Sequence, residues 1–293
     1  MRKTLVYLLL VIVIIAATVF VTLAVAKSPA EQLPSIKTIV EKSENLNSTT
    51  WVQTAVEYDM SAMQAYKMAK EKLIIALENE NWSALDKETN ATSELPPAVI
   101  LDIDETVLDN SPFQARLVKK NILYKDKLWD EWVNEAQAET IPGALEFIKF
   151  AKSTGVAVFY VTNRLYKNEK VTFDNLKSAG FPVESIDELL MKNEKEEWDS
   201  DKTSRRKFLS EKYRILLLIG DDMNDFVFLG KVTPEKRMQA GEKFSEKWGQ
   251  SWIILPNPQY GNWERSTYGY DYKLSEKEIV AKKLALLDTK QTK

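Results

Sequence analysis

The chain has 293 residues, of which 44% are hydrophobic, 28% charged and 10% aromatic, a composition typical of a folded globular protein and not of a disordered or collagen-like one. Forty basic residues against 43 acidic ones leave a net charge of -3, and no block of five like charges occurs, so the sequence gives no support to a nucleic-acid-binding surface. It contains no Cys and no His, which excludes disulfides, thiolate nucleophiles, Ser-His-Asp triads and zinc sites built on those residues. Any catalysis must therefore use carboxylates, Lys, Arg, hydroxyls and a cation that prefers oxygen ligands, which points to Mg²⁺.

The N-terminus, residues 1–26, is predicted to be a membrane-targeting segment. Arg2 and Lys3 precede an uncharged run from Leu5 to Ala26, which as a helix would be about 33 Å long and would span a bilayer. Ala24-Val25-Ala26 fits a cleavage site, so a cleaved signal peptide and a retained anchor both stay open, with an unusual core helix as a third reading. In the first two cases the rest of the chain lies outside the cytoplasm, because the positive charges precede the segment.

Residues 27–50 are polar and contain prolines, and they are predicted to form a tether. From Trp51 to Leu77, apolar residues recur every three or four positions, which predicts an amphipathic helix. Pro96-Pro97 would stop any helix, and Ala98 to Leu101 follows as a short apolar run. This run is predicted to be a buried strand with carboxylates at its C-terminal end.

The same alternation of helix and strand continues downstream. Further helices are predicted over residues 143–154, 168–179 and 203–212. Further strands are predicted over residues 156–161, 215–219 and 252–255. Strands that alternate with helices predict an α/β fold with a parallel sheet, whose ligands bind beyond the C-terminal ends of the strands.

Asp102 and Asp104 stand two residues apart where the first predicted strand opens into a loop. In extended geometry both side chains project to the same side, and two charges about 4 Å apart repel by roughly 4 kcal/mol at an effective dielectric of 20. A divalent cation, or a proton held on one carboxyl, relieves this repulsion. A bare Asp-x-Asp pair is more often a cap on the following helix, so the pair needs supporting residues elsewhere.

Those supporting residues occur in order along the chain as Thr162, Lys202, Asp221 and Asp225. With them, the sequence resembles the haloacid dehalogenase (HAD) superfamily of aspartate-nucleophile phosphatases. Three segments, residues 103–113, 159–164 and 256–264, resemble the class C acid phosphatases, a family that includes bacterial surface lipoproteins with 5′-nucleotidase activity. The resemblance covers roughly residues 50 to 270. It implies a HAD-like, Rossmann-type parallel sheet flanked by helices over residues 51–293, with a smaller, mostly helical cap formed by about residues 107–140 and parts of the N- and C-terminal helices.

The resemblance also implies roles for the motif residues. Asp102 would be the nucleophile that forms an aspartyl-phosphate, and Asp104 would protonate the leaving alcohol and then activate water. Mg²⁺ would be held by the Asp102 carboxylate, the Asp104 backbone carbonyl and Asp221, with Asp225 supporting. Thr162 would bind a phosphate oxygen and Lys202 would balance the charge of nucleophile and phosphate.

A second set of residues in the matched regions is predicted to bind substrate. Trp129 and Tyr260 match positions that stack on a nucleoside base, whereas Trp132, three residues from Trp129 on the same predicted helix, is expected to be core. The other predicted substrate-binding residues are Asn163, Arg164 and Phe113.

Two features depart from the family pattern. Asp222 stands where the family usually has Asn, which leaves the division of roles between Asp221 and Asp222 open. There is no Cys after the N-terminal segment to carry a lipid. Lys195 and Arg205 compete with Lys202 for the basic motif position, and spacing favours Lys202.

The sequence therefore predicts a secreted or membrane-anchored, Mg²⁺-dependent phosphomonoesterase, and the family resemblance suggests a homodimer. Its substrate would be a small molecule, with nucleoside 5′-monophosphates preferred. A haloalkanoic dehalogenase is the second enzyme reading, and Asp104 argues against it because that chemistry protonates no leaving alcohol. A non-catalytic surface protein that binds a ligand on the same fold is the alternative from another class.

Overall fold

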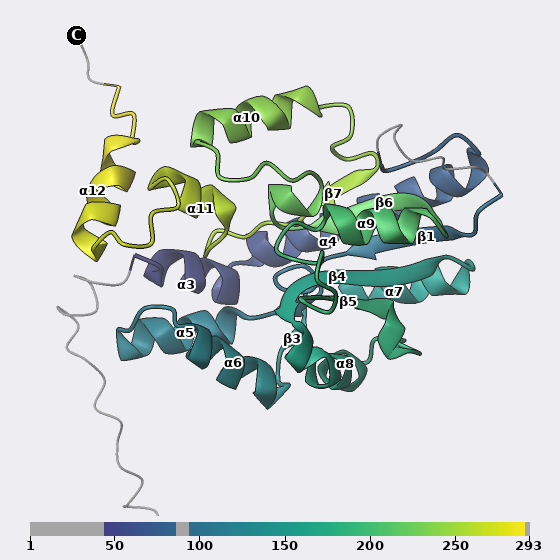
Figure 1. Ribbon diagram of the computed structural model, residues 1–293, viewed down its shortest axis with the longest axis horizontal. Coiled ribbons are helices and arrows are strands. Elements are labelled where there is room, and N and C mark those ends of the chain that lie inside the picture. Colours follow the sequence, from purple (N-terminus) through teal and green to yellow (C-terminus); the bar gives the residue numbers. More distant parts are fainter. Residues whose placement is uncertain (1–43, 86–93, 291–293) are drawn as a thin grey trace, which may run out of the picture.

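The computed structural model describes residues 44–85 and 94–290 (Figure 1). The predicted targeting segment and most of the predicted tether lie outside these residues. Within the described part, no helix is both long enough and apolar enough to cross a membrane. The α-helices are α3 (Leu46–Thr54), α4 (Val56–Glu78), α5 (Ser111–Lys120), α6 (Asp126–Glu135), α7 (Ala144–Ser153), α8 (Glu169–Ser178), α9 (Thr203–Ser210), α10 (Pro234–Lys243), α11 (Asn262–Thr267) and α12 (Glu276–Ala285). The 3-10 helices are η1 (Tyr166–Asn168), η2 (Ile186–Glu188) and η3 (Met223–Asp225).

The strands are β1 (Pro97–Leu101), β2 (Leu108–Asp109), β3 (Glu139–Thr140), β4 (Ala157–Leu165), β5 (Leu189–Lys192), β6 (Arg214–Gly220) and β7 (Trp252–Ile254). Five of them form one sheet in the order β5-β4-β1-β6-β7, and every neighbouring pair is parallel. The predicted α/β class with a parallel sheet is therefore confirmed. Because β1 is central and β4 and β6 flank it, the C-terminal ends of these three strands meet at one edge of the sheet.

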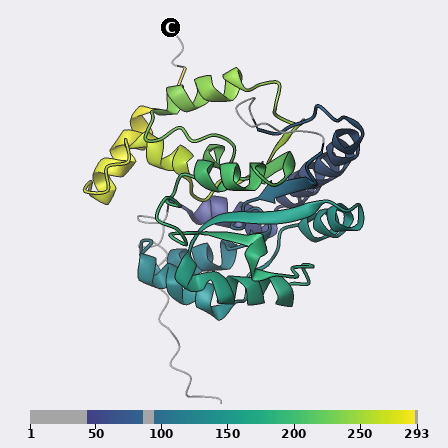
Figure 2. The same ribbon diagram turned by 45° about the vertical axis from the view of Figure 1, so that its right-hand side comes forward.

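Both faces of the sheet are buried, as the near-continuous apolar strands require. Successive side chains point to opposite faces, so Val99 and Leu101 enter one core together with α4 and α7, while Ala98 and Ile100 enter a second core. The second core is closed by α9 and by aromatic residues that include Trp252. Figures 1 and 2 show the sheet between these two layers of helices.

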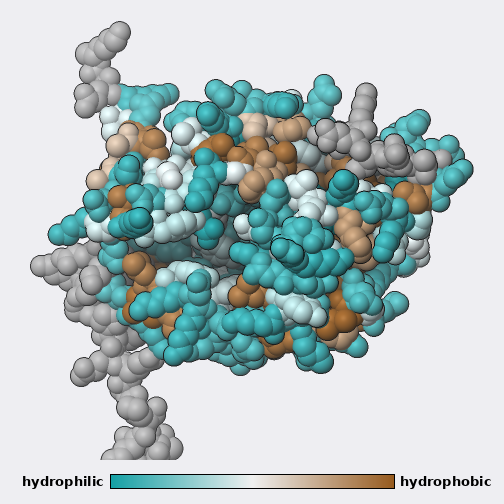
Figure 3. All heavy atoms as spheres, viewed as in Figure 1, coloured by the Kyte–Doolittle hydropathy of each residue, from teal (hydrophilic) through white to brown (hydrophobic). Residues whose placement is uncertain are grey.

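A small second unit is attached beyond the sheet. Strands β2 and β3 pair antiparallel and bracket α5 and α6, so this unit occupies the range in which the sequence predicts a cap. Both ribbon views place α5, α6 and α8 on one side of the molecule and α10 and α11 on the other (Figures 1 and 2). The surface between these two sides is hollowed (Figure 3).

Some boundaries differ from the sequence prediction. The helix expected from Trp51 begins earlier, at Leu46, and is broken at Ala55, whose backbone is extended with φ of -91° and ψ of 123°. The break lets α3 pack against α5 while α4 packs against α7 and the sheet. The edge strand β5 was not predicted, and β4 continues to Leu165, past the predicted end at residue 161.

Candidate active site

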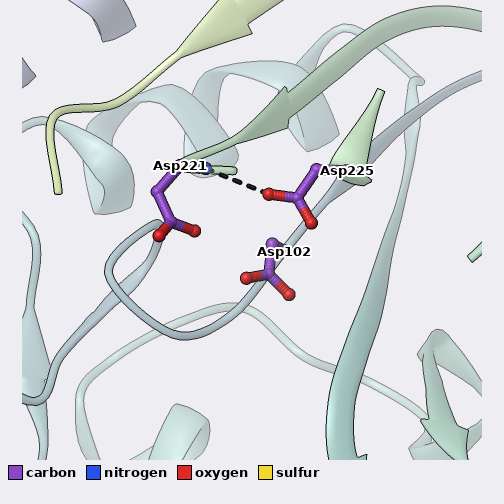
Figure 4. Close-up of side chains that lie close together, drawn as sticks. All are labelled: Asp102, Asp221 and Asp225. Atoms are coloured by element: carbon purple, nitrogen blue, oxygen red, sulfur yellow. Dashed lines mark hydrogen bonds between the residues drawn. The ribbon is translucent and has the colours of Figure 1, made fainter. Parts of the chain in front are cut away.

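Three carboxylates converge at the C-terminal edge of the sheet. Asp102 directly follows β1 and is fixed there because its backbone N–H donates to the carbonyl of Ile219 in β6 at 2.9 Å. Asp221 directly follows β6, and Asp225 ends η3. One ligand oxygen from each of the three carboxylates lies within 4.8 Å of the others, and Figure 4 shows the three side chains turned toward one another.

Lys202 connects two of these carboxylates. It stands at the N-cap of α9, its side chain is only 5% exposed, and its Nζ donates to Asp102 Oδ1 and, at 2.7 Å, to Asp225 Oδ1. Lys195 lies elsewhere, with its Nζ over the rings of Trp198 and Phe208. The structure therefore brings Lys202 to the predicted nucleophile.

Asp225 is fixed by the turn that it closes. Its Oδ2 accepts from the backbone N–H of Asp221 at 3.1 Å and of Asp222 at 2.9 Å. The chain comes so close here that a Cβ on Gly220 would lie 2.3 Å from this oxygen. Lys202 and backbone donors bond both oxygens of Asp225, so this residue holds the ammonium and the loop after β6 in place beside Asp102 and Asp221.

The site carries an excess of negative charge. Burial raises the pKa of Asp102 to about 7, although the Lys202 charge opposes this rise. Burial, together with the charges of Asp225 and Asp102, holds the pKa of Asp221 well above its ordinary value. For Lys202 burial acts to lower the pKa, but the two carboxylates outweigh it and the pKa is raised.

Three carboxylates meet the one ammonium of Lys202, and the buried Arg206 guanidinium lies nearby, bonded to the backbone carbonyl of Asp225 at 3.0 Å. The donor set consists of carboxylate oxygens, which are ligands for hard divalent cations such as Mg²⁺. The residues therefore fit such a cation, held by Asp102 and Asp221. The Asp221 carboxylate is oriented by Asn257, whose Nδ2 donates to Oδ2 at 2.8 Å.

The side chain of Asp104 lies outside this cluster of carboxylates. Its Oδ1 accepts hydrogen bonds from Arg164 Nε at 3.0 Å, Arg164 Nη2 at 2.8 Å and Asn110 Nδ2 at 2.9 Å. The predicted acid and the predicted nucleophile therefore have separate partners. Arg164, predicted to bind substrate, has a side chain that is 1% exposed and paired with Asp104.

Thr162 and Asn163 lie in β4, beside the nucleophile strand. Thr162 is fully buried, and its Oγ1 accepts from the backbone N–H of Arg164 at 3.1 Å. Asn163 is exposed, and its Oδ1 accepts from Nη2 of Arg205 at 2.9 Å. Arg205 also donates to the carbonyl of Thr162, so this competitor for the basic motif position fixes the end of β4.

The predicted aromatic residues come from three separate segments, α5, α6 and the stretch after β7. Trp129 is half-buried on α6, with its ring centroid 5.2 Å from that of Phe113. Phe113 is itself buried, at 2% exposed, so Trp129 covers it. Tyr260 is half-buried in the segment after β7, and its hydroxyl donates to Glu105. Trp132 is buried, as predicted for a core residue, and its Nε1 donates to Asn110 Oδ1 at 2.8 Å.

The sequence prediction missed the buried polar residues that support the loop after β1. Glu105 adopts a left-handed backbone with φ of 55° and is 2% exposed. Burial, and then the charges of Asp104 and Asp221, holds its pKa well above the ordinary value. In the sequence, Glu105 stands out only as a third acidic residue beside the Asp102/Asp104 pair.

Asp222, the departure from the family pattern, faces away from the cluster of carboxylates. Its Oδ2 accepts from the backbone N–H of Asn262 at 2.7 Å, and its Oδ1 lies 3.5 Å from Nη2 of Arg237 on α10. Its charge is therefore used to join the loop after β6 to α10 and α11. Asp221 is the residue that turns toward Asp102.

Comparisons with known proteins agree with this geometry. Residues 17–263 match the family described as HAD superfamily, subfamily IIIB (acid phosphatase). The class C acid phosphatase from Bacillus anthracis is 34% identical and superimposes with a TM-score of 0.75, covering 87% of this chain and 99% of that one. A structure of that organism's class C acid phosphatase with tungstate bound gives a TM-score of 0.73 at 34% identity, covering 84% and 97%.

Two plant proteins are similar over shorter stretches. The Stem 31 kDa glycoprotein of Glycine max is 29% identical over 163 residues, which is 55% of this chain and 58% of that protein. Acid phosphatase 1 of Solanum lycopersicum is 32% identical over 82 residues, 28% of this chain and 32% of that protein. The chain thus aligns with less than two thirds of the length of these relatives.

Proposed function

Because the chain belongs to the acid phosphatases of HAD subfamily IIIB, we propose that it hydrolyses small-molecule phosphomonoesters with Asp102 as the nucleophile. The observation that supports this most directly is the position of Lys202, whose Nζ bonds both Asp102 and Asp225 beside Asp221. A phosphatase needs a carboxylate kept ready to attack and positive charge to receive phosphate, and this arrangement supplies both.

In the first step an oxygen of Asp102 attacks phosphorus and the ester P–O bond breaks, giving an aspartyl-phosphate. Asp104 gives a proton to the leaving oxygen. In the second step Asp104 takes a proton from water, which attacks phosphorus and releases inorganic phosphate and the Asp102 carboxylate. The two carboxyls have separate partners, Lys202 for Asp102 and Arg164 for Asp104, so each is held in its own position for its step.

A divalent cation, proposed to be Mg²⁺, would be held by Asp102 and Asp221 and would supply positive charge to the phosphoryl oxygens. The chain's own residues prepare for it, because Asn257 orients Asp221 and the turn at Asp225 fixes the loop. Lys202 would balance the charge of the nucleophile.

The first test uses substitutions of the two carboxyls. Asp102→Asn should abolish turnover of a chromogenic phosphomonoester, and Asp104→Asn should lower kcat by at least about 10²-fold, the usual scale of general acid-base catalysis. Both variants should keep the wild-type melting temperature within a few degrees. Near-normal activity of a folded Asp102→Asn protein would refute the nucleophile assignment.

The second part of the same test removes the cation. Exhaustive chelation should abolish activity, and Mg²⁺ should restore it. Full activity in protein shown by elemental analysis to contain no metal would contradict the cation requirement. A protein that binds nucleotides but never hydrolyses them would instead support the non-catalytic alternative.

Nucleoside 5′-monophosphates are the proposed substrates, because Trp129 and Tyr260 offer aromatic rings beside the site.

The enzyme is proposed to act outside the cytoplasm, since Arg2 and Lys3 precede the uncharged N-terminal run. Intact-mass measurement on protein from the native membrane would decide whether cleavage occurs. An active site accessible only from the cytoplasm would refute the orientation.

A further inference from the structure

We propose that Arg164, Asn110 and Trp132 are positioning residues for the acid Asp104, fixing one of its carboxylate oxygens so that the other exchanges the proton with the leaving group. The inference deepens the proposed function and rests on it, because it concerns the step that protonates the leaving alcohol. It gives Arg164 a role other than direct binding of substrate.

Arg164 is committed to Asp104 by both donors on one edge of its guanidinium. Nε and Nη2 donate to the same oxygen, Oδ1, at 3.0 Å and 2.8 Å. On the far side, Nη1 donates to Thr172 Oγ1 at 3.3 Å, which prevents the group from turning. With its side chain 1% exposed, Arg164 has little surface left with which to meet a phosphate.

Asn110 adds a third donor to the same oxygen and is itself oriented by Trp132. The Asn110 side chain is fully buried. Its Nδ2 donates to Asp104 Oδ1 at 2.9 Å, and its Oδ1 accepts from Trp132 Nε1 at 2.8 Å. An indole N–H only donates, and Asp104 Oδ1 is the oxygen that also accepts from Arg164, so the amide turns its NH2 to Asp104 and its oxygen to Trp132.

Three donors on Oδ1 leave the proton-exchanging role to Oδ2. In the protonated acid, a half-turn of the carboxyl group would bring the O–H against these three donors, so the proton stays on Oδ2. In the first step one proton moves from Oδ2 to the oxygen of the breaking P–O bond, as Asp102 forms its bond to phosphorus. In the second step Oδ2 takes one proton back from the attacking water, so the protons balance over the cycle.

The test compares two substrates that differ only in how much their leaving group needs a proton. Phenoxide is more basic than 4-nitrophenoxide, so phenyl phosphate depends on the acid more than 4-nitrophenyl phosphate does. Both carry one ring, so ring stacking affects them alike. The quantity to measure is kcat/KM, which reports the steps up to cleavage of the ester bond.

We expect Arg164→Gln to lower kcat/KM for phenyl phosphate by on the order of tenfold more than for 4-nitrophenyl phosphate, in the same direction as Asp104→Asn. Trp132→Phe keeps an aromatic ring but removes the N–H. It should lower the ratio of kcat/KM for phenyl phosphate to kcat/KM for 4-nitrophenyl phosphate by about two- to tenfold, the effect of one hydrogen bond. Arg164→Lys keeps the charge but loses the edge with two donors. Its ratio of kcat/KM for phenyl phosphate to kcat/KM for 4-nitrophenyl phosphate should lie between those of wild type and Arg164→Gln.

Arg214→Gln is the matched control. Arg214 is also a buried arginine in the same sheet, but it stands at the opposite end of β6 and donates to the carbonyl of Asn79 at 2.8 Å. Its loss should lower stability and leave the substrate ratio unchanged.

Equal losses on both substrates in Arg164→Gln would overturn the proposal, and so would a higher KM with unchanged kcat, which would indicate phosphate binding. If Arg164→Gln does not fold, Trp132→Phe and Arg164→Lys still decide, because an unchanged ratio in both overturns the proposal. Failure of the proposed function itself is seen separately, as retained activity in Asp102→Asn.

Discussion

At the scale of single residues, the site depends on a contact that only glycine allows. Gly220 ends β6, and the Asp225 side chain packs directly over its Cα. Because Asp225 holds both Lys202 and the backbone after β6, Gly220 sets the position of Asp221 as well. A residue with no functional group is thus part of the geometry of the carboxylates.

Gly220→Ala should therefore be destabilising and should lower activity. The new Cβ would lie 2.5 Å from Asp225 Cβ, and overpacking of this kind costs about 1 to 3 kcal/mol. Gly241→Ala in α10 is the control, since nothing lies within 4 Å of its added Cβ and Ala is favoured over Gly in a helix by about 0.5 to 1 kcal/mol. Thermal unfolding and phosphatase assays of both variants measure the effects. An unaltered Gly220→Ala enzyme would contradict the packing argument.

The titration of the buried carboxyls predicts how stability depends on pH in protein freed of metal. The folded-state pKa of Asp102 is raised from 3.8 to about 7, and that of Asp221 is also raised. Folding then favours the protonated carboxyl, so this stabilisation is complete below the ordinary pKa and is lost as the pH rises through the folded-state value. The melting temperature should fall between about pH 5 and pH 8.

We expect a fall of at least about 3 °C, since about 1 kcal/mol shifts the melting temperature of a protein of this size by about 2 to 4 °C. Saturating Mg²⁺ should reduce the fall, because the cation replaces the proton in balancing the charge. Asp221→Asn should reduce it as well. A metal-free protein whose stability rises over this range would show that the sign is wrong.

At the scale of helices and strands, the central elements could be predicted because their signals are local. The four longer apolar runs became β1, β4, β6 and β7, and the glycines after residues 154 and 179 end helices as predicted. Strand β5 was not predicted, because its apolar run, Leu189 to Met191, has only three residues and no proline marks its end, as Pro256 does after the run that became β7. The break at Ala55 could not be predicted, since the helical periodicity continues through it and only tertiary packing separates α3 from α4.

The same distinction applies to the site. The carboxylates and Lys202 could be predicted because each follows a strand or begins a helix in a fixed order. The contacts of Glu105 and Arg164 could not, because they join residues remote in sequence: the hydroxyl that bonds Glu105 belongs to Tyr260, 155 residues away, and Arg164 is 60 residues from Asp104. Burial of these polar groups becomes visible only when the segments are brought together.

The aromatic residues of α6 and of the segment after β7 lead to a prediction about the leaving group. Trp129 on α6 should stack on a nucleoside base, and such stacking is worth about 1 to 3 kcal/mol. Trp129→Ala should therefore lower kcat/KM for a nucleoside monophosphate by roughly 5- to 150-fold. Tyr260→Phe keeps the ring but loses the hydrogen bond to Glu105. A loss of activity in this variant would therefore come from weaker support of the loop, and not from lost stacking.

A small alkyl phosphate provides the control for Trp129→Ala, because it has no ring to stack. Its kcat/KM should hardly change. Equal losses on the nucleotide and the alkyl phosphate would show that Trp129 supports Phe113 and the fold instead.

At the scale of the whole molecule, residues from both ends of the described chain meet. Lys283 on α12 donates to Glu44 and, at 2.7 Å, to Glu264 on α11. Gln259, just after the β7 segment, donates to Thr49 on α3 at 3.1 Å across 210 residues. Helix α3 and the C-terminal segment of the described chain therefore close the same side of the fold, beside the loop that carries Tyr260.

The central place of β1 in the sheet has a consequence for synthesis of the chain. The loop after β1 leaves the ribosome early, but its Lys202 partner is 100 residues further on, and Asp221 comes later still, in contact with Thr106 across 115 residues. Lys202 emerges before β6, and Asp221 and Asp225 emerge after it, so the cluster around Asp102 can assemble only once β6 has paired with β1. A chain truncated before Asp225 therefore lacks part of the cluster of carboxylates around Asp102.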